Sequence, residues 1–310
     1  MSGYVVCIGT SNVDVQGFVE SSVMMQDKNP GGTIEVWVGG VARNVAENLA
    51  RLGLSVKMLT AVGDDIFANK IIRDSSNAGI DMSHALILQN CRSGVYISIT
   101  DADGDLAVGL TDMNITDRMT IDYFASKRAV LEGASVFVLS PENPEIIDYL
   151  SHHYQQKPMF VDVTSKGYVA GLRPYLSAIH TVKANLPETE ELADIPIETE
   201  EDIDRAADIM IDQGVQRMVI TLGKDGVFYK DSDGVTLRKR TKEVTQVVNA
   251  TGAGDALLAG VVYGFVNELD LDSTLSFAMS AAILTLNHKN TINQALSSKM
   301  VTQFMKESTV

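Results

Sequence analysis

The sequence is poor in cysteine and in positive charge. Cys7 and Cys91 are the two cysteines among 310 residues, and their spacing suits neither a metal site nor a disulfide framework. Lys and Arg number 25 against 40 Asp and Glu, which gives a formal net charge of −15. This charge makes a nucleic-acid backbone an unfavourable partner, and a small anionic substrate would need local positive groups.

Long apolar runs are also missing. The stretch 277–286 is shorter than a bilayer-spanning helix needs, and residues 1–14 lack the basic start and long apolar run of a signal peptide. We therefore expect a soluble, cytoplasmic protein with no membrane partner. The hydrophobic share of 45% is sufficient for a sizeable packed core.

Short β-branched runs alternate with helix-like segments along most of the chain. The predicted strands are 4–9, 55–63, 134–140, 158–163 and 217–223. The segment 39–53 has apolar residues near helical spacing and ends at Gly53, so it is predicted to be a helix. Such alternation predicts an α/β fold with a mostly parallel sheet covered by helices.

Two segments break this rhythm. Residues 31–40 and 93–110 alternate in strand fashion without an intervening helix, and "DADGD" within the second is a turn signal. We predict a small β lid, formed by two insertions at about 14–38 and 93–112, on a single domain spanning 1–310. The acidic segment 187–205 is predicted to be a solvated helical surface with a connecting loop.

The segment "VVNATGAGDALLAG" (247–260) places a glycine-rich turn before an apolar helix that we expect to start near Asp255. Glycines let successive N–H groups point one way, and a helix start adds unpaired N–H groups and partial positive charge. The turn is therefore a candidate phosphate site. On these residues alone, a plain turn with Asp255 as helix N-cap is equally well supported. The Lys of a P-loop and the third glycine of a dinucleotide fingerprint are both missing.

Further motifs occur in order along the chain. They are "GTSNVDV" (9–15), "GGVARN" (39–44), "KANLPETEEL" (183–192) and "TLGKDGVF" (221–228). Together with "TGAGD" (251–255), this set resembles the ribokinase family, also called the PfkB carbohydrate kinases, over nearly the whole chain. The resemblance implies a ribokinase-like three-layer α/β sandwich with a mostly parallel central sheet and a small β-sheet lid. It also implies a kinase that uses ATP and Mg²⁺ on a small-molecule sugar or nucleoside.

The resemblance implies roles for individual residues. Asp255 matches the catalytic aspartate, a base that would accept the proton of a substrate hydroxyl as it attacks the γ-phosphate. The N–H groups that would hold charge on the phosphoryl oxygens belong to Gly252, Ala253 and Gly254. The positions that match sugar-binding residues are Asn12, Asp14, Gly39, Gly40 and Asn44.

Other matches lie at further strand ends. Glu142 corresponds to a glutamate found at this strand end in ribokinases, and Lys166 is either a positive group near substrate or a solvated loop lysine. Asn185 and Glu188 match an Asn-x-x-Glu element that positions Mg²⁺, largely through water, and the nucleotide phosphates. The matches to the nucleotide-binding strand end and loop are Thr221, Gly223 and Gly226. The segment 286–294 falls where the family has its adenine-side loop.

With "TDMNI" (111–115) and "NATGAGDA", the chain resembles the branch of the family that phosphorylates pseudouridine. Asp112 can accept from a uracil N–H, and Asn114 can donate to a carbonyl, although a loop Asp and Asn otherwise form turns. We therefore expect phosphorylation of a nucleoside 5′-hydroxyl, with pseudouridine as the first candidate. Ribokinase or another sugar or purine-nucleoside kinase is the alternative, and a catalytically silent sugar-binding regulatory protein is the non-enzymatic one.

Two expectations concern a cation and assembly. Asn249 stands where the family usually has an Asp near a monovalent-cation site, and a neutral amide removes one charge, so K⁺ activation stays open. The aromatic residues Trp37 and Tyr96 lie on the predicted lid, where they contact either the ligand or the protein. The lid also offers exposed strand edges, which favour pairing, so we expect a homodimer through the lid.

Overall fold

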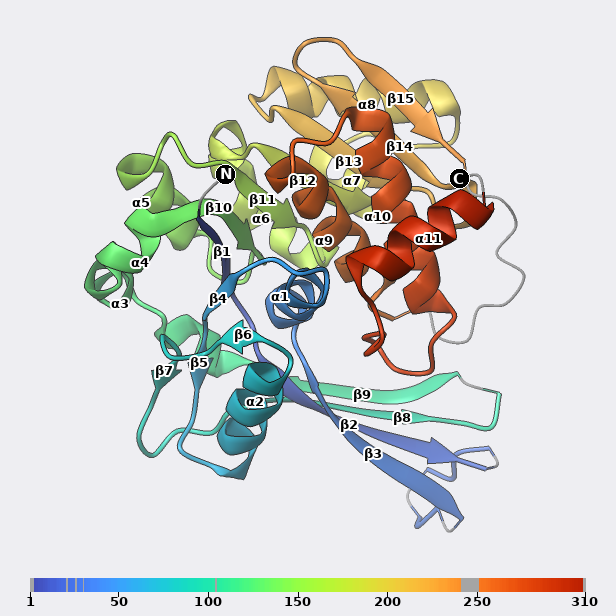
Figure 1. The fold of residues 1–310 in the computed structure, drawn as a ribbon. Helices are drawn as coiled ribbons and strands as arrows, with labels where there is room; N and C mark the ends of the chain where they lie inside the picture. The colour runs from blue at the N-terminus through green and yellow to red at the C-terminus, as the bar shows by residue number, and fades with distance from the viewer. Residues whose placement is uncertain are drawn as a thin grey trace.

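The computed structural model describes residues 3–20, 22–25, 27–29, 31–103, 105–240 and 251–308. Its large sheet has the strand order β15-β14-β13-β12-β11-β10-β1-β4-β6 (Figure 1). The strands are β1 (Tyr4–Ile8), β4 (Val56–Leu59), β6 (Ile80–Asp81), β10 (Ala134–Leu139), β11 (Met159–Asp162), β12 (Thr181–Asn185), β13 (Arg217–Thr221), β14 (Val227–Asp231) and β15 (Thr236–Lys239). Strands from β6 to β13 run parallel, and β14 and β15 are antiparallel, so the predicted mostly parallel sheet is confirmed.

The predicted strand 55–63 is one exception. Its first part forms β4, but the chain leaves the large sheet at Thr60. The second part, β5 (Ala61–Val62), pairs with β7 (Leu86–Ile87) in a separate small sheet. An uninterrupted apolar run therefore contains two strands, because pairing partners and not hydrophobicity decide where a strand ends.

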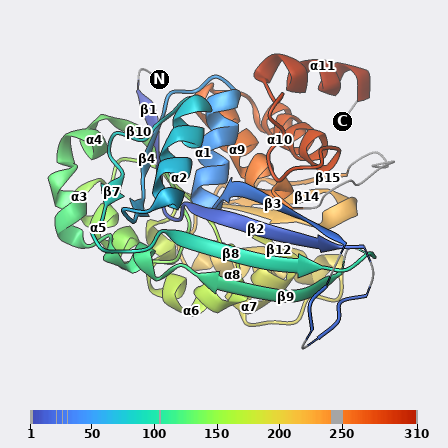
Figure 2. The same cartoon turned by 90° about the horizontal axis from the view of Figure 1, so that it is seen from below.

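Helices cover both faces of the large sheet, because successive strand residues point to opposite sides. One apolar core contains Val5 and Cys7 of β1, and a second core contains Val6 and Ile8 of the same strand. The first lies under α1 (Val41–Arg51), α2 (Ile66–Asn77), α9 (Ala253–Val266), α10 (Leu271–Leu286) and α11 (Ser298–Ser308). The second lies under α3 (Ile121–Ser126), α4 (Arg128–Gly133), α5 (Glu145–His153), α6 (Val169–Leu172), α7 (Leu186–Ala193) and α8 (Glu200–Asp212). Figure 2 shows the resulting three layers.

Two sequence predictions about helices are confirmed. The segment 39–53 contains α1, which begins after Gly40, where φ is +101°. A Cβ at Gly40 would lie 2.4 Å from the carbonyl oxygen of Thr10, so the chain needs glycine there. The acidic segment 187–205 covers most of α7, a loop and the start of α8. Among the described residues, no helix has both the length and the apolar character needed to cross a bilayer.

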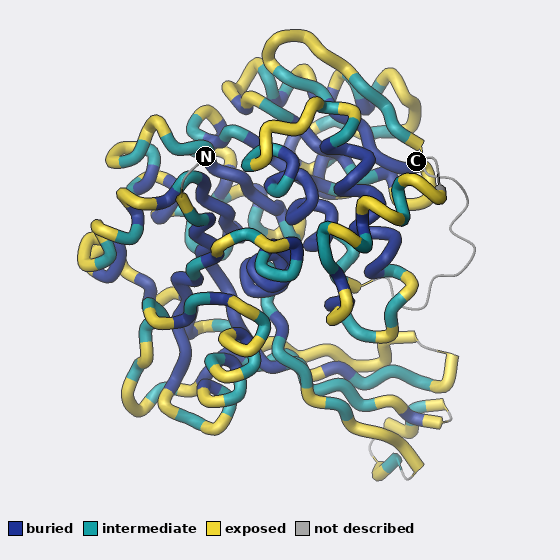
Figure 3. The backbone as a smooth tube through the Cα atoms, in the orientation of Figure 1, coloured by how far each residue is buried: buried dark blue, intermediate teal, exposed yellow. Residues whose placement is uncertain are grey.

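A smaller sheet extends from the main body beside α2 (Figure 1). Its strands, in the order β3-β2-β8-β9, are β2 (Asn12–Val19), β3 (Gly32–Gly39), β8 (Gly94–Thr100) and β9 (Leu106–Asp112). We call it the lid sheet. Its strands run out to a tip where most residues are exposed or intermediate (Figure 3).

The register of the lid sheet sorts its residues onto two faces. Asp14 lies opposite Trp37 on β3 and Tyr96 on β8, so these three side chains share what we call the inner face. Val15 lies opposite Val36 and Ile97, which share the outer face. The inner face therefore carries polar and aromatic groups, and the outer face is apolar.

Candidate active site

Polar side chains gather where the parallel strands of the large sheet end. Thr10, Ser11 and Asn12 follow β1, Asp162 ends β11, and Asn185 ends β12. Ligands of open α/β sheets bind outside the carboxyl ends of the strands. This edge of the sheet, at the root of the lid sheet, is therefore the candidate site.

Asp255 occupies the centre of this region. Helix α9 begins at Ala253, with Gly252 as its N-cap at a φ of +83°, so Asp255 lies inside the first turn. The helix therefore starts near Asp255, as expected, but its N-cap is Gly252, so the alternative of a plain turn with Asp255 as helix N-cap is wrong. The Oδ2 atom of Asp255 instead accepts a hydrogen bond of 2.9 Å from the Nδ2 atom of Asn44 on α1.

The surroundings of Asp255 shift its ionisation strongly. The residue is 9% exposed. Burial raises the pKa of Asp255 to about 7, and the charge of Asp162 adds to this rise, while Lys183 and the Asn44 hydrogen bond oppose it. A carboxyl group that titrates near neutral pH is suited to accept a proton from a hydroxyl group.

A buried ion pair beside Asp255 was not found by sequence reasoning. The Nζ atom of Lys183 donates to both carboxylate oxygens of Asp162, at 3.0 and 2.9 Å, and the two residues are 7% and 2% exposed. A Cβ at Gly254 would lie 2.8 Å from this Nζ atom, so the amine lies directly against the glycine turn. The signal in the sequence is an ionisable residue inside an otherwise apolar strand, in "MFVDV" and "TVKAN".

The glycine turn is confined on two sides. A Cβ at Gly252 would lie 2.0 Å from the carbonyl oxygen of Thr291, and Gly254 is confined by Lys183. The N–H of Ala256 donates to the carbonyl of Gly252. The N–H groups of Ala253 and Gly254 come earlier in the helix, where N–H groups have no partner within the helix. N–H groups at a helix start with a lysine amine beside them fit a phosphate group. The anion-binding role of this turn stays a prediction.

Asn12, Asp14 and Gly39 meet at the root of the lid sheet. The Nδ2 atom of Asn12 donates to the Oδ1 atom of Asp14 at 2.6 Å. A Cβ at Gly39 would lie 2.3 Å from the other oxygen of Asp14, so the carboxylate occupies the space above this glycine. Burial raises the pKa of Asp14 to about 6, against the effects of Asn12 and Arg43. The structure thus brings the predicted sugar-binding positions together near Asp255, although their role stays a prediction.

Glu142 lies beside the end of β1. Its Oε1 atom accepts a hydrogen bond of 2.6 Å from the hydroxyl of Thr10. Among the described residues, its other carboxylate oxygen is buried without a hydrogen-bond partner, as are the hydroxyls of Ser11 and Ser140. Buried polar atoms without partners in the protein suit a ligand rich in hydroxyl groups. Sequence reasoning named Glu142 but missed the two serines.

Two further predicted substrate residues, Asp112 and Asn114, lie at the end of β9 and just beyond it. Asp112 lies opposite Val95, so it is on the outer face, whereas Thr111 lies opposite Tyr96 on the inner face. Asn114 begins the short 3₁₀ helix η1 (Asn114–Arg118) and donates to Asp112 at 3.1 Å. Both residues are exposed. The register therefore argues against the direct base contact predicted for Asp112.

Lys166 also lies apart from Asp255. It begins the 3₁₀ helix η2 (Lys166–Tyr168), and its amine is 3.9 Å from a carboxylate oxygen of Glu190 on α7. Its side chain is half exposed. Of the two interpretations given for Lys166, the structure favours a solvated lysine, and Lys183 is the buried lysine next to the glycine turn.

Asn185 and Glu188 form a capping box at the start of α7. The Oδ1 atom of Asn185 accepts from the N–H of Glu188, and the Oε2 atom of Glu188 accepts from the N–H of Asn185, both at 2.9 Å. Glu188 is buried, which raises its pKa. Its Oε1 atom lies outside the capping box. One carboxylate oxygen next to a phosphate site fits Mg²⁺ held largely through water, and this role stays a prediction.

The nucleotide-side loop follows β13. Thr221 lies opposite Asn185 in the β12–β13 register. Gly223 and Gly226 have φ values of +60° and +95°, and a Cβ at Gly226 would lie 2.0 Å from the carbonyl oxygen of Lys239. The loop is thus held beside the capping box. Asn249, on which the K⁺ question depends, lies outside the described residues.

The chain is similar to known proteins over nearly its whole length. The pattern of the pfkB family carbohydrate kinases matches residues 2–298. Pseudouridine kinase of Escherichia coli (strain K12) is 33% identical over 295 residues, which cover 95% of this chain and 94% of that protein. Among solved structures, Arabidopsis thaliana ribokinase complexed with ribose and ATP has a TM-score of 0.86 at 21% identity and covers 99% of both chains. A carbohydrate kinase from Agrobacterium tumefaciens has a TM-score of 0.84 at 21% identity, covering 98% and 97%. The predicted fold class, including the ribokinase-like sandwich, is confirmed.

Replacing Asp255 should stabilise the protein above neutral pH. The folded-state pKa of about 7 exceeds the ordinary value of 3.8, so the free energy of unfolding decreases as the pH rises through this range. Asp255→Asn removes this loss, and we expect a higher Tm at about pH 8 and a gain that disappears towards about pH 4. Thermal unfolding of both proteins across this range measures it.

Asp270→Asn is the control for this prediction. Asp270 is the exposed N-cap of α10, and the N–H of Ser273 lowers its pKa. Its replacement should give no gain in Tm at any pH. An Asp255→Asn protein with an unchanged or lower Tm at pH 8 would contradict the burial of an ionised carboxylate.

Proposed function

The chain belongs to the pfkB family of carbohydrate kinases, and we propose that it transfers the γ-phosphate of ATP to the 5′-hydroxyl of a nucleoside, pseudouridine foremost. The proposal depends above all on Asp255. This carboxyl group has a pKa of about 7, bonds to Asn44 on the sugar side, and lies in the helix turn next to the glycines. The 33% identity to a pseudouridine kinase supports the choice of acceptor.

In the proposed reaction, Asp14 accepts hydrogen bonds from the ribose hydroxyls and the 5′-hydroxyl lies at Asp255. Asp255 takes the proton of this hydroxyl while its oxygen bonds to the γ-phosphorus, and the bond to the bridging oxygen of ADP breaks. The N–H groups of the glycine turn and the amine of Lys183 hold the charge on the phosphoryl oxygens. Bound Mg²⁺ would neutralise phosphate charge, with Glu188 holding it through water.

The inner face of the lid sheet offers a surface for a base. Trp37 and Tyr96 lie on this face with Asp14 at their level in the register. Aromatic rings can stack on a nucleobase, whereas a free sugar would leave them without this contact. This observation favours a nucleoside over a sugar. A catalytically silent binding protein is disfavoured because it has no need of a buried carboxylate at this position.

ATP consumption with a panel of acceptors tests the proposal. With Mg²⁺ at about pH 8, kcat/KM should be at least about tenfold higher for pseudouridine than for uridine, inosine or ribose. Mass spectrometry and ³¹P NMR should identify a 5′-monophosphate. Asp255→Asn should lose roughly 10²–10⁴ in rate.

Two variants test the contributions of the inner and outer faces of the lid sheet in the same assay. Tyr96→Ala should reduce the use of pseudouridine more than the use of ribose, and Asp112→Ala should leave their ratio unchanged, because Asp112 lies on the outer face. A preference for ribose in the unmodified protein would refute the nucleoside assignment. A protein that consumes no ATP with any acceptor would refute the kinase.

The rate should increase with pH on the acid side. Asp255 and Asp14 must both be ionised to act, and their pKa values are about 7 and about 6. We expect kcat/KM for the acceptor to rise from about pH 5.5, with an apparent pKa near 7, and to level off by about pH 8. Steady-state rates at constant ionic strength measure the profile. A flat profile over this range would show that neither carboxyl group limits the reaction.

We also propose that the protein forms a homodimer through the outer faces of its lid sheets. This face carries exposed apolar side chains on both edge strands, with Ile34 of β3 75% and Leu110 of β9 62% exposed. Val36, Ile97 and Val108 share the face by register. A contiguous apolar patch of this kind is typical of an interaction surface, and a second copy offers the same shape and polarity.

The mass in solution tests the homodimer. Light scattering should give twice 33.5 kDa for the unmodified protein. Ile34→Asp combined with Leu110→Asp should give a folded monomer, because burying two carboxylates in the interface is unfavourable. Thr33→Asp, at a neighbouring position on the inner face, is the control and should stay dimeric. A monomeric unmodified protein would refute the homodimer.

A further inference from the structure

Helix α1 carries three charged side chains that the proposed reaction does not use. Arg43, Glu47 and Arg51 follow one another at four-residue spacing, so they lie along one stripe of the helix. Arg43 and Glu47 are each 4% exposed. Charged side chains are rarely this buried unless they are paired, so their partners are informative. We call these three residues the α1 ladder.

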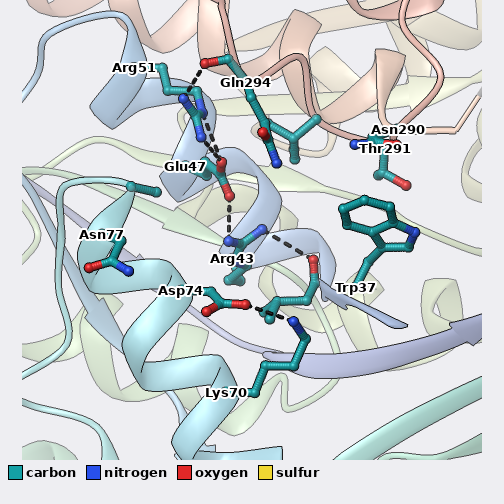
Figure 4. Close-up of a pocket in the computed structure, with 13 residues that line it drawn as sticks. Trp37, Arg43, Glu47, Arg51, Lys70, Asp74, Asn77, Asn290, Thr291 and Gln294 are labelled. Carbon is teal, nitrogen blue, oxygen red and sulfur yellow. Dashed lines mark hydrogen bonds and ion pairs between the residues drawn. The ribbon is translucent and has the colours of Figure 1, made fainter. Parts of the chain in front are cut away.

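Glu47 stands in the middle of the α1 ladder and divides its carboxylate between two arginines (Figure 4). Its Oε2 atom pairs with the Nη2 atom of Arg43. Its Oε1 atom accepts from the Nε and Nη2 atoms of Arg51, at 2.7 and 2.5 Å. The ladder is therefore a continuous chain of ion pairs along α1.

Each end of the α1 ladder continues to another part of the fold. Arg43 donates to the carbonyl oxygen of Val38 on β3 and to the hydroxyl of Ser75 on α2, both at 3.2 Å. Arg51 donates through Nη1 to the carbonyl oxygen of Gln294, beyond the end of α10. The ladder thus joins a strand of the lid sheet to the segment 290–294.

Both connected parts touch the candidate site. Val38 precedes Gly39, which lies under the carboxylate of Asp14. The segment 290–294 contains Thr291, whose carbonyl oxygen confines Gly252 in the glycine turn. The substrate side and the phosphate side are therefore connected through one helix, which also carries the Asn44 that bonds to Asp255.

A cavity of about 270 Å³ separates the two connected parts. Trp37 of the lid sheet faces Asn290 and Thr291 across it (Figure 4). Every side-chain nitrogen of Arg43 and Arg51 already has an acceptor in the protein. Each guanidinium is thus held by the protein at all three of its nitrogens, and the ladder is a direct polar connection along the wall of this cavity.

We propose that Arg43, Glu47 and Arg51 are positioning residues that couple binding of the acceptor under the lid sheet to binding of the ATP phosphates at the glycine turn. This inference rests on the proposed function. A bound acceptor restricts the positions of Asp14 and Gly39, and therefore of the adjoining Val38 carbonyl that Arg43 contacts. The ion pairs of the ladder then restrict Arg51 and its contact with Gln294. Because Gln294 belongs to the segment 290–294, the position of the glycine turn is restricted as well. Each ligand then binds more tightly when the other is present, and by the same factor, because such coupling is reciprocal.

Arg51→Gln is the variant that tests the coupling. It removes the connection to Gln294 but leaves the buried pair of Arg43 and Glu47, whereas loss of Glu47 would leave two guanidinium groups without their carboxylate. Arg51→Lys keeps the charge and should restore part of the coupling. The matched control is Arg128→Gln, which breaks an exposed pair with Glu132 at the same spacing on α4.

Titration calorimetry measures the coupling factor. The Kd of pseudouridine, with ribose as a second acceptor, is determined without and with saturating Mg²⁺ and a non-hydrolysable ATP analogue, and the reverse titration is done as well. We expect the analogue to tighten acceptor binding by at least about fivefold in the unmodified protein and in Arg128→Gln. In Arg51→Gln the factor should fall to below about twofold in both directions.

The outcomes separate this inference from the proposed function. An Arg51→Gln protein with the full coupling factor, whether or not its Tm is lower, would show that the ladder only stabilises the fold. An unmodified protein that binds both ligands without coupling would also overturn the inference and leave the kinase assignment standing. If the unmodified protein binds the ATP analogue but neither acceptor, the proposed nucleoside function fails and the coupling fails with it.

Discussion

A single hydrogen bond, from Asn44 to Asp255, links the two helices on which the site depends. Both helices begin at a glycine with positive φ, and in each case a carbonyl oxygen occupies the place where a side chain would start. These two turns bring the first residues of α1 and α9 together outside the carboxyl ends of the strands. In this position Asp255 is buried, with 9% of the residue exposed. Burial raises its pKa to about 7, which is the property that a proton acceptor needs.

The carboxylates that suit the site to proton transfer also make the folded state less stable. Asp14, Asp162 and Asp255 lie close enough for Asp255 to respond to the other two, and Lys183 is a cation that acts on Asp162 and Asp255. Like charges in a buried site raise one another's pKa, and the folded state is less stable at high pH as a result. The amine of Lys183 relieves part of this repulsion and lies against the glycine turn. A protein of strongly negative net charge thus places a buried cation at the point where an anionic substrate would bind.

Periodicity and turn residues predicted a sheet covered by helices, five strands of the large sheet and the helix within 39–53, and the family resemblance predicted the three layers. What they could not predict depends on pairing between distant segments. The run 55–63 divides because β5 pairs with another strand, β7. A shift of one residue in register decides that Thr111, and not Asp112, is on the same face of the lid sheet as Asp14. The pair of Asp162 and Lys183 forms across neighbouring strands. Arg43 and Glu47 have the spacing of a solvated helix surface, and only the packing of β3 and α2 against them shows that they are buried.

The root and the tip of the lid sheet differ in their surroundings. At the root, Asn12 lies opposite both Gly39 and Gly94, so the two strand junctions of the lid converge within the candidate site. Substitutions there alter the space around Asp14. Towards the tip, most of the described residues are exposed or intermediate. The proposed dimer surface is the outer face, whereas the proposed acceptor site is at the root of the inner face. Substitutions in one can therefore accumulate without altering the other, so the proposed assembly and the proposed substrate preference are free to diverge independently within one small sheet.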